Sequence, residues 1–295
     1  MNIALQFLGA VNVTIPHSFT EEDIQSLHRR YHFSLLFADS AAQFLDYGQF
    51  QGMKQDLLGV IIGEDEVDAL HPEKIVTYDR VVTLGKSAWR EEANALKMTK
   101  GAVLPQDMYA ILLDPDGKAT PMSIEQWMDA VESAEKSLLT SQVKSFISAI
   151  TPDRLLWRSF GFAAVRNRIS WWIRPDQSLK GAGYLDIKPQ LLLLNPQGLS
   201  VLFDLLPEII DSPEKGRRAI IASQDVVRHR EDAKALGRKN PLFNRFAYWT
   251  SNRKLYKRIR AKLGGRISEI ACDQGLVDLD AMVFFEEAGI KVRQW

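Results

Sequence analysis

The segment YAILLDPDGKATPM, residues 109–122, contains residue types that can hold a phosphate group. Gly117 would let backbone N–H groups approach a phosphate closely, and the Lys118 side chain could donate hydrogen bonds to its oxygens. Asp114 and Asp116 oppose this, because each carboxylate about 4 Å from a phosphate charge costs on the order of 1–4 kcal/mol. A plain turn between two strands explains the same residues, with proline presetting φ and glycine in the left-handed region. The composition favours the turn.

Histidine and cysteine, which often bind metals or act as nucleophiles, form no recognisable motif here. His28 and His32 are four residues apart on an expected helix, so they could share a metal ion. No third ligand lies at a matching spacing, and we interpret both as surface or capping residues. Cys272 has no assignable activating base and is interpreted as a small buried residue. We therefore predict no metal site and no catalytic residue.

The apolar pattern predicts the framework that would position any such site. Short apolar runs rich in β-branched residues alternate with helical patterns. Because the runs are continuously apolar, we expect strands buried on both faces and joined by helical crossovers, which is typical of α/β layering. The expected strands are residues 11–15, 33–38, 59–62, 109–113, 169–173, 190–195 and 267–271.

Three expected helices have recognisable ends. Thr20, followed by two glutamates, is typical of an N-cap, and this helix is expected to continue to Arg30. Ser123 is expected to begin a second helix. A third is expected over residues 276–288 and is ended by Gly289.

The bulk composition is typical of a soluble globular protein, with 46% hydrophobic and 25% charged residues. The 295 residues are enough to bury about three quarters of the unfolded chain's surface. A single cysteine excludes an internal disulfide, and the N-terminal sequence lacks the features of a secretory signal. No apolar run approaches the length of a membrane span. We expect a cytoplasmic protein, with peripheral contact to a membrane left open.

The charge is unevenly distributed, although the net charge is zero. Residues 215–266 hold sixteen lysines and arginines against three acidic residues, which indicates an anionic partner for that segment. A basic helix is expected over 240–264, and we interpret it as amphipathic with a solvated face. The alternative is contact with anionic lipid; nucleic acid is not expected, because no recognition motif accompanies the charge. The cations of the lipid hypothesis are Arg253, Lys254, Lys257, Arg258 and Arg260.

In order and spacing, these segments resemble the large domain of adenylate-forming enzymes, specifically the long-chain acyl-CoA synthetase branch. Residues 4–39 resemble its glycine-alanine turn, strand and Thr-x-x-Glu helix start, and YDRVVTLGKSAWREEANAL resembles the approach to its phosphate loop. ISAITPDRLLWRSFGF resembles the strand, loop and helix that normally contain Leu-Pro-Leu-x-His. The stretches IKPQLLLLNPQGLSVLFDLLPEI and LFNRF to the end resemble the helix pair, Gly-Gly turn, adenine-loop strand and following helix.

The resemblance implies a layered α/β/α domain of mostly parallel sheets, incomplete relative to the family. We expect it to span residues 1–295, either as one domain or as subdomains 1–140 and 141–295. The sequence ends before the family's Tyr-Gly-x-Thr-Glu segment, so we also expect the C-terminal lid domain to be missing.

Several positions depart from the family's pattern. The phosphate loop, normally rich in glycine and hydroxyl groups, is matched by Asp114, Asp116, Gly117, Lys118 and Thr120. Arg154 replaces the motif histidine near the acyl and adenylate groups, and Gln197 replaces an arginine. The small loop that packs against adenine is replaced by Cys272, Asp273, Gln274 and Gly275. Trp157 belongs to an aromatic set that is either a remnant of an acyl-binding wall or plain core, the other members being Phe160, Phe162, Trp171 and Trp172.

These departures lead to three functional hypotheses. The leading one is a pseudoenzyme that cannot adenylate and binds an acyl group, an acyl carrier or a related synthetase, with no cofactor. The alternative is an active or trans-complemented long-chain fatty-acid–CoA ligase, which would need ATP and magnesium. The third is an adaptor at an anionic membrane surface, and it rests on the basic charge of residues 215–266 alone.

Overall fold

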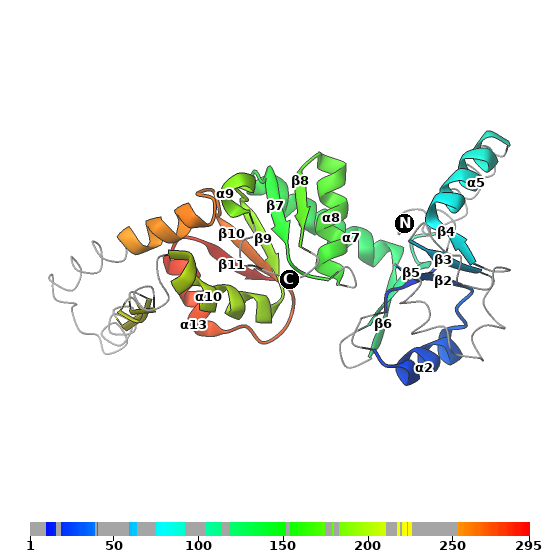
Figure 1. Ribbon diagram of the computed structural model, residues 1–295, viewed down its shortest axis with the longest axis horizontal. Coiled ribbons are helices and arrows are strands. Elements are labelled where there is room, and N and C mark those ends of the chain that lie inside the picture. Colours follow the sequence, from blue (N-terminus) through cyan, green and yellow to red (C-terminus); the bar gives the residue numbers. More distant parts are fainter. Residues whose placement is uncertain are drawn as a thin grey trace. The chain divides into compact units, whose positions relative to one another are not determined.

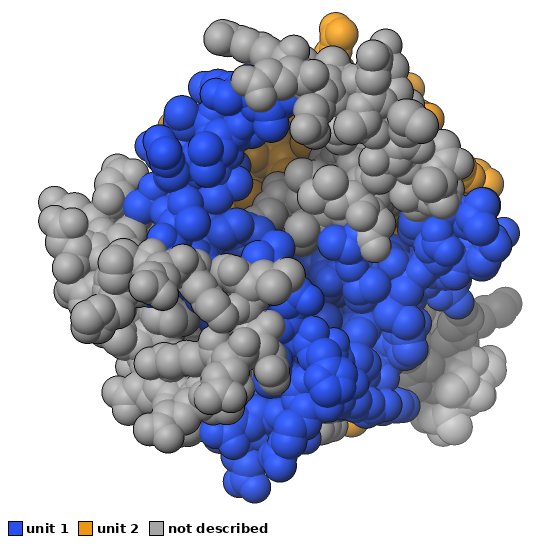
Figure 2. All heavy atoms as spheres, turned by 90° about the vertical axis from the view of Figure 1, so that its right-hand side faces the viewer, with its two compact units in different colours: residues 1–126 blue, residues 127–295 orange. Residues whose placement is uncertain are grey.

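The computed structural model describes residues 10–15, 19–38, 40, 59–63, 75–91, 104–113, 118–151, 154–174, 179, 183–210, 217–218, 220–222, 224–225 and 253–295. The chain divides into two compact units, Met1–Gln126 and Trp127–Trp295, which Figure 2 colours separately. Both units combine helices with sheets that contain parallel strands (Figure 1), so the α/β class predicted from the apolar pattern is confirmed.

The first unit contains two three-stranded sheets. In one sheet β1 pairs in parallel with β5, and β5 pairs antiparallel with β6; in the other, β2, β3 and β4 are all parallel. The strands are β1 (Asn12–Val13), β2 (Leu35–Ala38), β3 (Gly59–Ile62), β4 (Ile75–Thr77), β5 (Met108–Leu113) and β6 (Ala119–Ser123). Two helices accompany them, α2 (Glu21–Tyr31) and α5 (Tyr78–Glu91).

Helix α2 begins where the sequence predicts, because Thr20 forms a capping box with Asp23. The Asp23 carboxylate accepts from the Thr20 backbone N–H at 2.9 Å, and the Thr20 hydroxyl accepts from the Asp23 N–H at 3.4 Å. The side-chain hydrogen bond from Thr20 holds the pKa of Asp23 below its ordinary value. The buried side chains Ile24 and Leu27 attach the helix to the core of this unit.

The second unit is built on one five-stranded sheet in which every pair of neighbouring strands is parallel. The strand order is β11-β10-β9-β7-β8. Its strands are β7 (Ser145–Ser148), β8 (Ser170–Ile173), β9 (Leu191–Leu194), β10 (Glu269–Cys272) and β11 (Lys291–Gln294). Its helices are α7 (Ile124–Thr140), α8 (Leu155–Asn167), α9 (Tyr184–Ile187), α10 (Pro196–Ile210) and α13 (Leu279–Glu287), with a further helix over residues 253–262.

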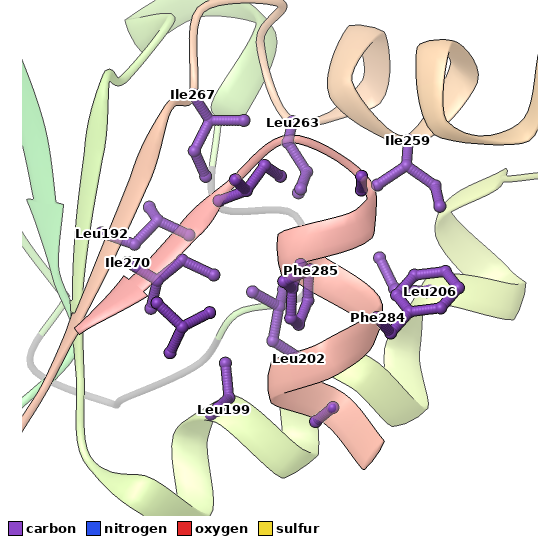
Figure 3. Packing of buried hydrophobic residues seen from close by; sticks show 14 of the residues in the cluster. Leu192, Leu199, Leu202, Leu206, Ile259, Leu263, Ile267, Ile270, Phe284 and Phe285 are labelled. Atoms are coloured by element: carbon purple, nitrogen blue, oxygen red, sulfur yellow. The ribbon is translucent and has the colours of Figure 1, made fainter. Parts of the chain in front are cut away.

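The main core of this unit lies on one face of the sheet. Leu192 of β9 and Ile270 of β10 contribute the sheet side, and α10, α13 and the 253–262 helix cover it (Figure 3). Phe285 of α13 is fully buried among leucines of α10 in this view. Burying a side chain of this size stabilises the fold by roughly 1.5–3 kcal/mol.

Each strand predicted from the apolar pattern is present, and its ends agree with the structure to within three residues. Four further strands of the structure were not predicted: β4 is only three residues long, β6 contains a proline, β7 has a serine at each end, and β11 at a sheet edge has Val292 as its one apolar residue. The helix expected over 276–288 starts later, at Leu279, since the Asp278 side chain accepts from the N–H groups of Asp280 and Ala281.

Gly264 and Gly265 form a matched pair for testing how α9 packs against the turn before β10. Both have positive φ, 92° and 76°, but a Cβ on Gly264 would overlap the Tyr184 carbonyl oxygen, whereas one on Gly265 would meet open space. We expect Gly265→Ala to cost about 1–2 kcal/mol from backbone strain alone. Gly264→Ala should cost about 1–3 kcal/mol more, because the backbone must also shift. Chemical denaturation measures both; equal losses would contradict the close packing.

Candidate functional site

The carboxyl ends of the five parallel strands meet at one edge of the second unit's sheet. From β7 the chain passes to β8 on one side, whereas β9 is followed by β10 and β11 on the other, so the strand order reverses between β7 and β9. In open parallel sheets, ligands bind in the crevice outside the carboxyl ends at such a reversal. This edge is therefore the candidate site.

An ion pair links two predicted site residues across this edge. Arg154 precedes α8 and Asp273 follows β10, and Arg154 Nε lies 3.7 Å from Asp273 Oδ2. The Arg154 side chain is 29% exposed and that of Asp273 is 16% exposed. Arg154 occupies the N-cap of α8 without a side-chain capping bond, so its cation lies at the positive end of the helix dipole. The Asp273 carboxylate offsets that unfavourable charge.

The loop that carries Asp273 is fixed by several backbone contacts. The Asp273 N–H donates to the Leu194 carbonyl at 2.9 Å, and its Oδ1 accepts from the Gln274 N–H at 3.0 Å. The Gly275 carbonyl accepts from Gln294 Nε2 at 2.9 Å. A side chain at Gly275 would begin 2.9 Å from Pro196 Cγ, so only glycine allows this approach. The loop thus holds the Asp273 carboxylate in place.

The third predicted segment starts α10 at the same edge. Asn195 caps this helix, since its Oδ1 accepts from the Gly198 N–H at 2.6 Å. Gln197 is exposed in the first turn. The cap at Asn195 was not predicted, although asparagine directly before a proline is a recognised start signal for a helix. The positions of Arg154, Gln197 and Asp273 thus follow β7, β9 and β10, three neighbouring strands.

Aromatic rings pack where α8 covers the other face of the sheet. Trp157 contacts Trp171 at 4.6 Å between ring centroids, and Phe160 contacts Trp295 at 4.9 Å. Phe146 of β7 stacks on Trp171 at 6.1 Å. The predicted aromatic set is thus divided: Phe162 contacts Trp127 instead, and Trp172 is half exposed. Phe146 and Trp295 were not predicted as members of the cluster, because both join it through long-range pairing.

Three neutral hydrogen-bond donors are buried around this aromatic cluster. They are the hydroxyl of Ser148 and the indole nitrogens of Trp157 and Trp171, and none has a hydrogen-bond partner within the described residues. Phe146 pairs in register with Trp171, so Ser148, two residues along β7, points to the same face of the sheet. A buried donor without a partner costs about 1–3 kcal/mol. An oxygen atom of a ligand would remove that cost.

Cys272 is a buried core residue, as the sequence predicts. Its side chain is fully buried, and burial together with the charge of Asp273 raises the pKa of the thiol to about 12. At neutral pH the thiol is therefore protonated and a poor nucleophile.

The described part of the basic helix turns its apolar side into the core. Leu255, Tyr256 and Ile259 are buried there. Two of the cations lie near the ends of other helices: Arg258 Nη2 donates to the carbonyl of Ile210, the last residue of α10, at 3.2 Å, and Arg260 lies close to the backbone that follows α13. Cations at helix C-termini are stabilising. Arg253, Lys254 and Lys257 are exposed, and residues 240–252 lie outside the described residues.

The Gly-Lys segment lies in the first unit, between two antiparallel strands. Leu113 of β5 pairs with Ala119 of β6. Asp114, Asp116 and Gly117 lie outside the described residues, while Lys118 and Thr120 are exposed. The flanking residues thus belong to paired antiparallel strands, and the turn interpretation of the residues between them stays a prediction.

The two histidines of α2 have structural roles. His32 is the C-cap residue of the helix, and its N–H donates to the His28 carbonyl at 2.7 Å. His28 is buried, and its Nδ1 accepts from the Phe33 N–H at 3.2 Å. Among the described residues, no three metal-binding side chains gather in one place. In that same part of the chain, no helix has both the length and the apolar character needed to cross a bilayer.

Comparison with solved structures defines the class of fold. The chain superimposes on the adenylation domain of a carboxylic acid reductase from Segniliparus rugosus, in complex with AMP and a co-purified carboxylic acid, with a TM-score of 0.56, 10% identity and coverage of 100% of this chain and 45% of that one. A luciferase-like enzyme from the mealworm Zophobas morio superimposes with a TM-score of 0.57 at 11% identity, covering 99% of this chain and 55% of that one. Coronafacic acid ligase from Pectobacterium brasiliense superimposes with a TM-score of 0.54 at 11% identity, covering 70% of this chain and 39% of that one.

The fold is therefore similar to that of adenylate-forming enzymes, which include acid ligases, adenylation domains and luciferase-like proteins. This chain spans 39–55% of the length of these three solved chains. No protein-family model matches the sequence, and no curated protein matches it. At 10–14% identity the likeness concerns the fold.

The buried state of Cys272 can be tested by thiol labelling. It is the only cysteine of the chain. Because its pKa is raised to about 12 from 9.0, the thiol contributes stability below about pH 9 that is lost as the pH rises toward 12. At pH 8 we expect Ellman's reagent to label no thiol in the folded protein and one after unfolding in guanidinium chloride. Rapid labelling of the folded protein would contradict the burial.

Substituting two neighbouring cations, Arg258 and Lys257, can distinguish stabilisation of the end of α10 from the effect of surface charge. Arg258→Gln should lower the free energy of unfolding by about 0.5–1.5 kcal/mol, because the Ile210 carbonyl loses its donor. Lys257→Gln removes the same charge from an exposed position and should change it by less than about 0.5 kcal/mol. Urea denaturation measures both variants. An equal loss would show that Arg258 acts through its charge alone.

Proposed function

We propose that this chain binds an acyl group on a fold of the adenylate-forming type and does not adenylate a carboxylate. The acyl chain lies against the aromatic cluster under α8, and its head group lies at the carboxyl edge of the sheet. By its resemblance to the long-chain acyl-CoA synthetase branch, the ligand is a long, apolar acyl chain.

The ion pair between Arg154 and Asp273 carries this proposal. It places a fixed carboxylate at the edge where ligands bind in open parallel sheets, 3.7 Å from the cation of Arg154. The guanidinium is thereby neutralised. Close to Arg154 in the chain, Trp157 belongs to an aromatic cluster whose buried neutral donors have no partner within the described residues, and such apolar surroundings suit an acyl chain better than a polyanion.

The residues at this edge do not suit a nucleotide triphosphate. A phosphate about 4 Å from the Asp273 carboxylate would be repelled by on the order of 1–4 kcal/mol per phosphate charge, and the paired Arg154 cation offsets this repulsion without leaving a net attraction. The resemblance aligns the same loop with the position that packs against adenine, and here it carries Asp273 and Gln274 instead of small residues. We derive no catalytic step through ATP or magnesium.

A second candidate is an active ligase, either with a rebuilt nucleotide site or completed by another chain. The fold favours it, because one of the structures matched over the whole of this chain is an adenylation domain solved with AMP and a co-purified carboxylic acid. An active ligase would have to bind ATP with magnesium, and the proposed acyl-binding module would not.

Nucleotide binding and exchange distinguish the two candidates. We expect the purified chain to show no ATP-dependent pyrophosphate exchange with a panel of fatty and aromatic acids, and no heat of binding when titrated with ATP and magnesium. Asp273→Ala serves as the matched variant, because it removes the carboxylate that we hold responsible. A gain of measurable ATP binding in this variant would support the electrostatic reason. Robust exchange by the unaltered chain would overturn the proposal.

A further inference from the structure

We propose that the acyl ligand carries an uncharged head group, such as an ester, thioester or amide, and that Asp273 sets this preference by excluding free carboxylates. This inference rests on the proposed function and specifies the chemical class of its ligand. Three observations support it: the fixed position of Asp273, its pairing with Arg154, and the neutral donors beside the aromatic cluster.

Asp273 cannot easily move away from an incoming head group. Its backbone is hydrogen-bonded to β9 through Leu194, one of its carboxylate oxygens accepts from the Gln274 N–H, and the loop is held at Gly275 against Pro196. Arg154 has a long, partly exposed side chain, and its own backbone lies at the start of α8. A ligand therefore meets a carboxylate in a constant position and a cation that is already paired.

The charge of the head group then determines how tightly the ligand binds. A free carboxylate can reach Arg154 only by displacing Asp273 or by sharing the guanidinium with it, and either arrangement brings two negative charges close together. An uncharged ester or amide avoids this repulsion. The pair is partly exposed, so solvent screening keeps the discrimination modest.

The buried donors provide what an uncharged head group needs. The indole N–H groups of Trp157 and Trp171 and the hydroxyl of Ser148 are neutral, and they can donate to a carbonyl oxygen. Trp157 stands in the first turn of α8, within one turn of Arg154, and its ring contacts that of Trp171. A carbonyl at this point would be close to both the aromatic cluster and the edge of the sheet.

The test compares one acyl chain with two head groups by calorimetric titration. Octanamide and octanoate have equal chain length and differ in charge. We expect the unaltered chain to bind octanamide more tightly than octanoate. In Asp273→Asn, which keeps the size and the Gln274 contact, octanoate should gain about two- to fivefold in affinity while octanamide stays unchanged. Asp280→Asn removes the same charge from an exposed position on α13 and should leave the ratio unchanged.

A second variant keeps the test decisive if Asp273→Asn fails to fold. Arg154→Gln leaves Asp273 without this cation, so octanoate should lose affinity and octanamide should not. A purely structural effect of either substitution would change both affinities equally. If the unaltered chain prefers octanoate, or neither variant changes the ratio, the inference is wrong while the proposed function stands. If no form binds either compound or its longer-chain homologues, the proposed function itself is wrong.

Discussion

Hydrogen bonding along β9 organises the larger unit. This strand lies at the centre of the five-stranded sheet, pairs in parallel with β7 and β10, and consists of four fully buried leucines. Leu192 and Leu194 belong to the core under α10 and α13, so alternation directs Leu191 and Leu193 to the face covered by α8. Since both faces depend on this strand, the helices on either side of the sheet depend on it as well. The loops that follow β7, β9 and β10 are brought together by the same pairing.

The carboxyl edge shows how charge and apolar surface are divided in this unit. Arg154 and Asp273 neutralise each other at the rim, and the aromatic rings of Trp157, Trp171 and Trp295 lie beside α8. The ion pair leaves neither charge uncompensated by the other, and the aromatic rings beside α8 are partly buried. This separation of charge from apolar side chains is the basis of the proposed acyl-binding role.

The sequence predicts local features well and long-range pairs poorly. The apolar run at β9 and the cap at Thr20 depend on neighbouring residues, and the structure confirms both. The expected sites at Arg154 and Asp273 were identified separately by resemblance, but their ion pair could not be, because it depends on the register of strands far apart in the chain. Strand β11 was missed for a related reason: its pairing with β10 outweighs its weak apolar pattern.

The packing of the 253–262 helix limits how this protein could meet a lipid bilayer. Its leucine, tyrosine and isoleucine side chains hold the core together, and extracting each from it would cost roughly 1.5–3 kcal/mol. The helix therefore cannot insert these side chains into a membrane while the unit stays folded. Any attraction between Lys254 or Lys257 and acidic phospholipid must draw in the unit as a rigid body, adsorbed through surface charge and released as the ionic strength rises.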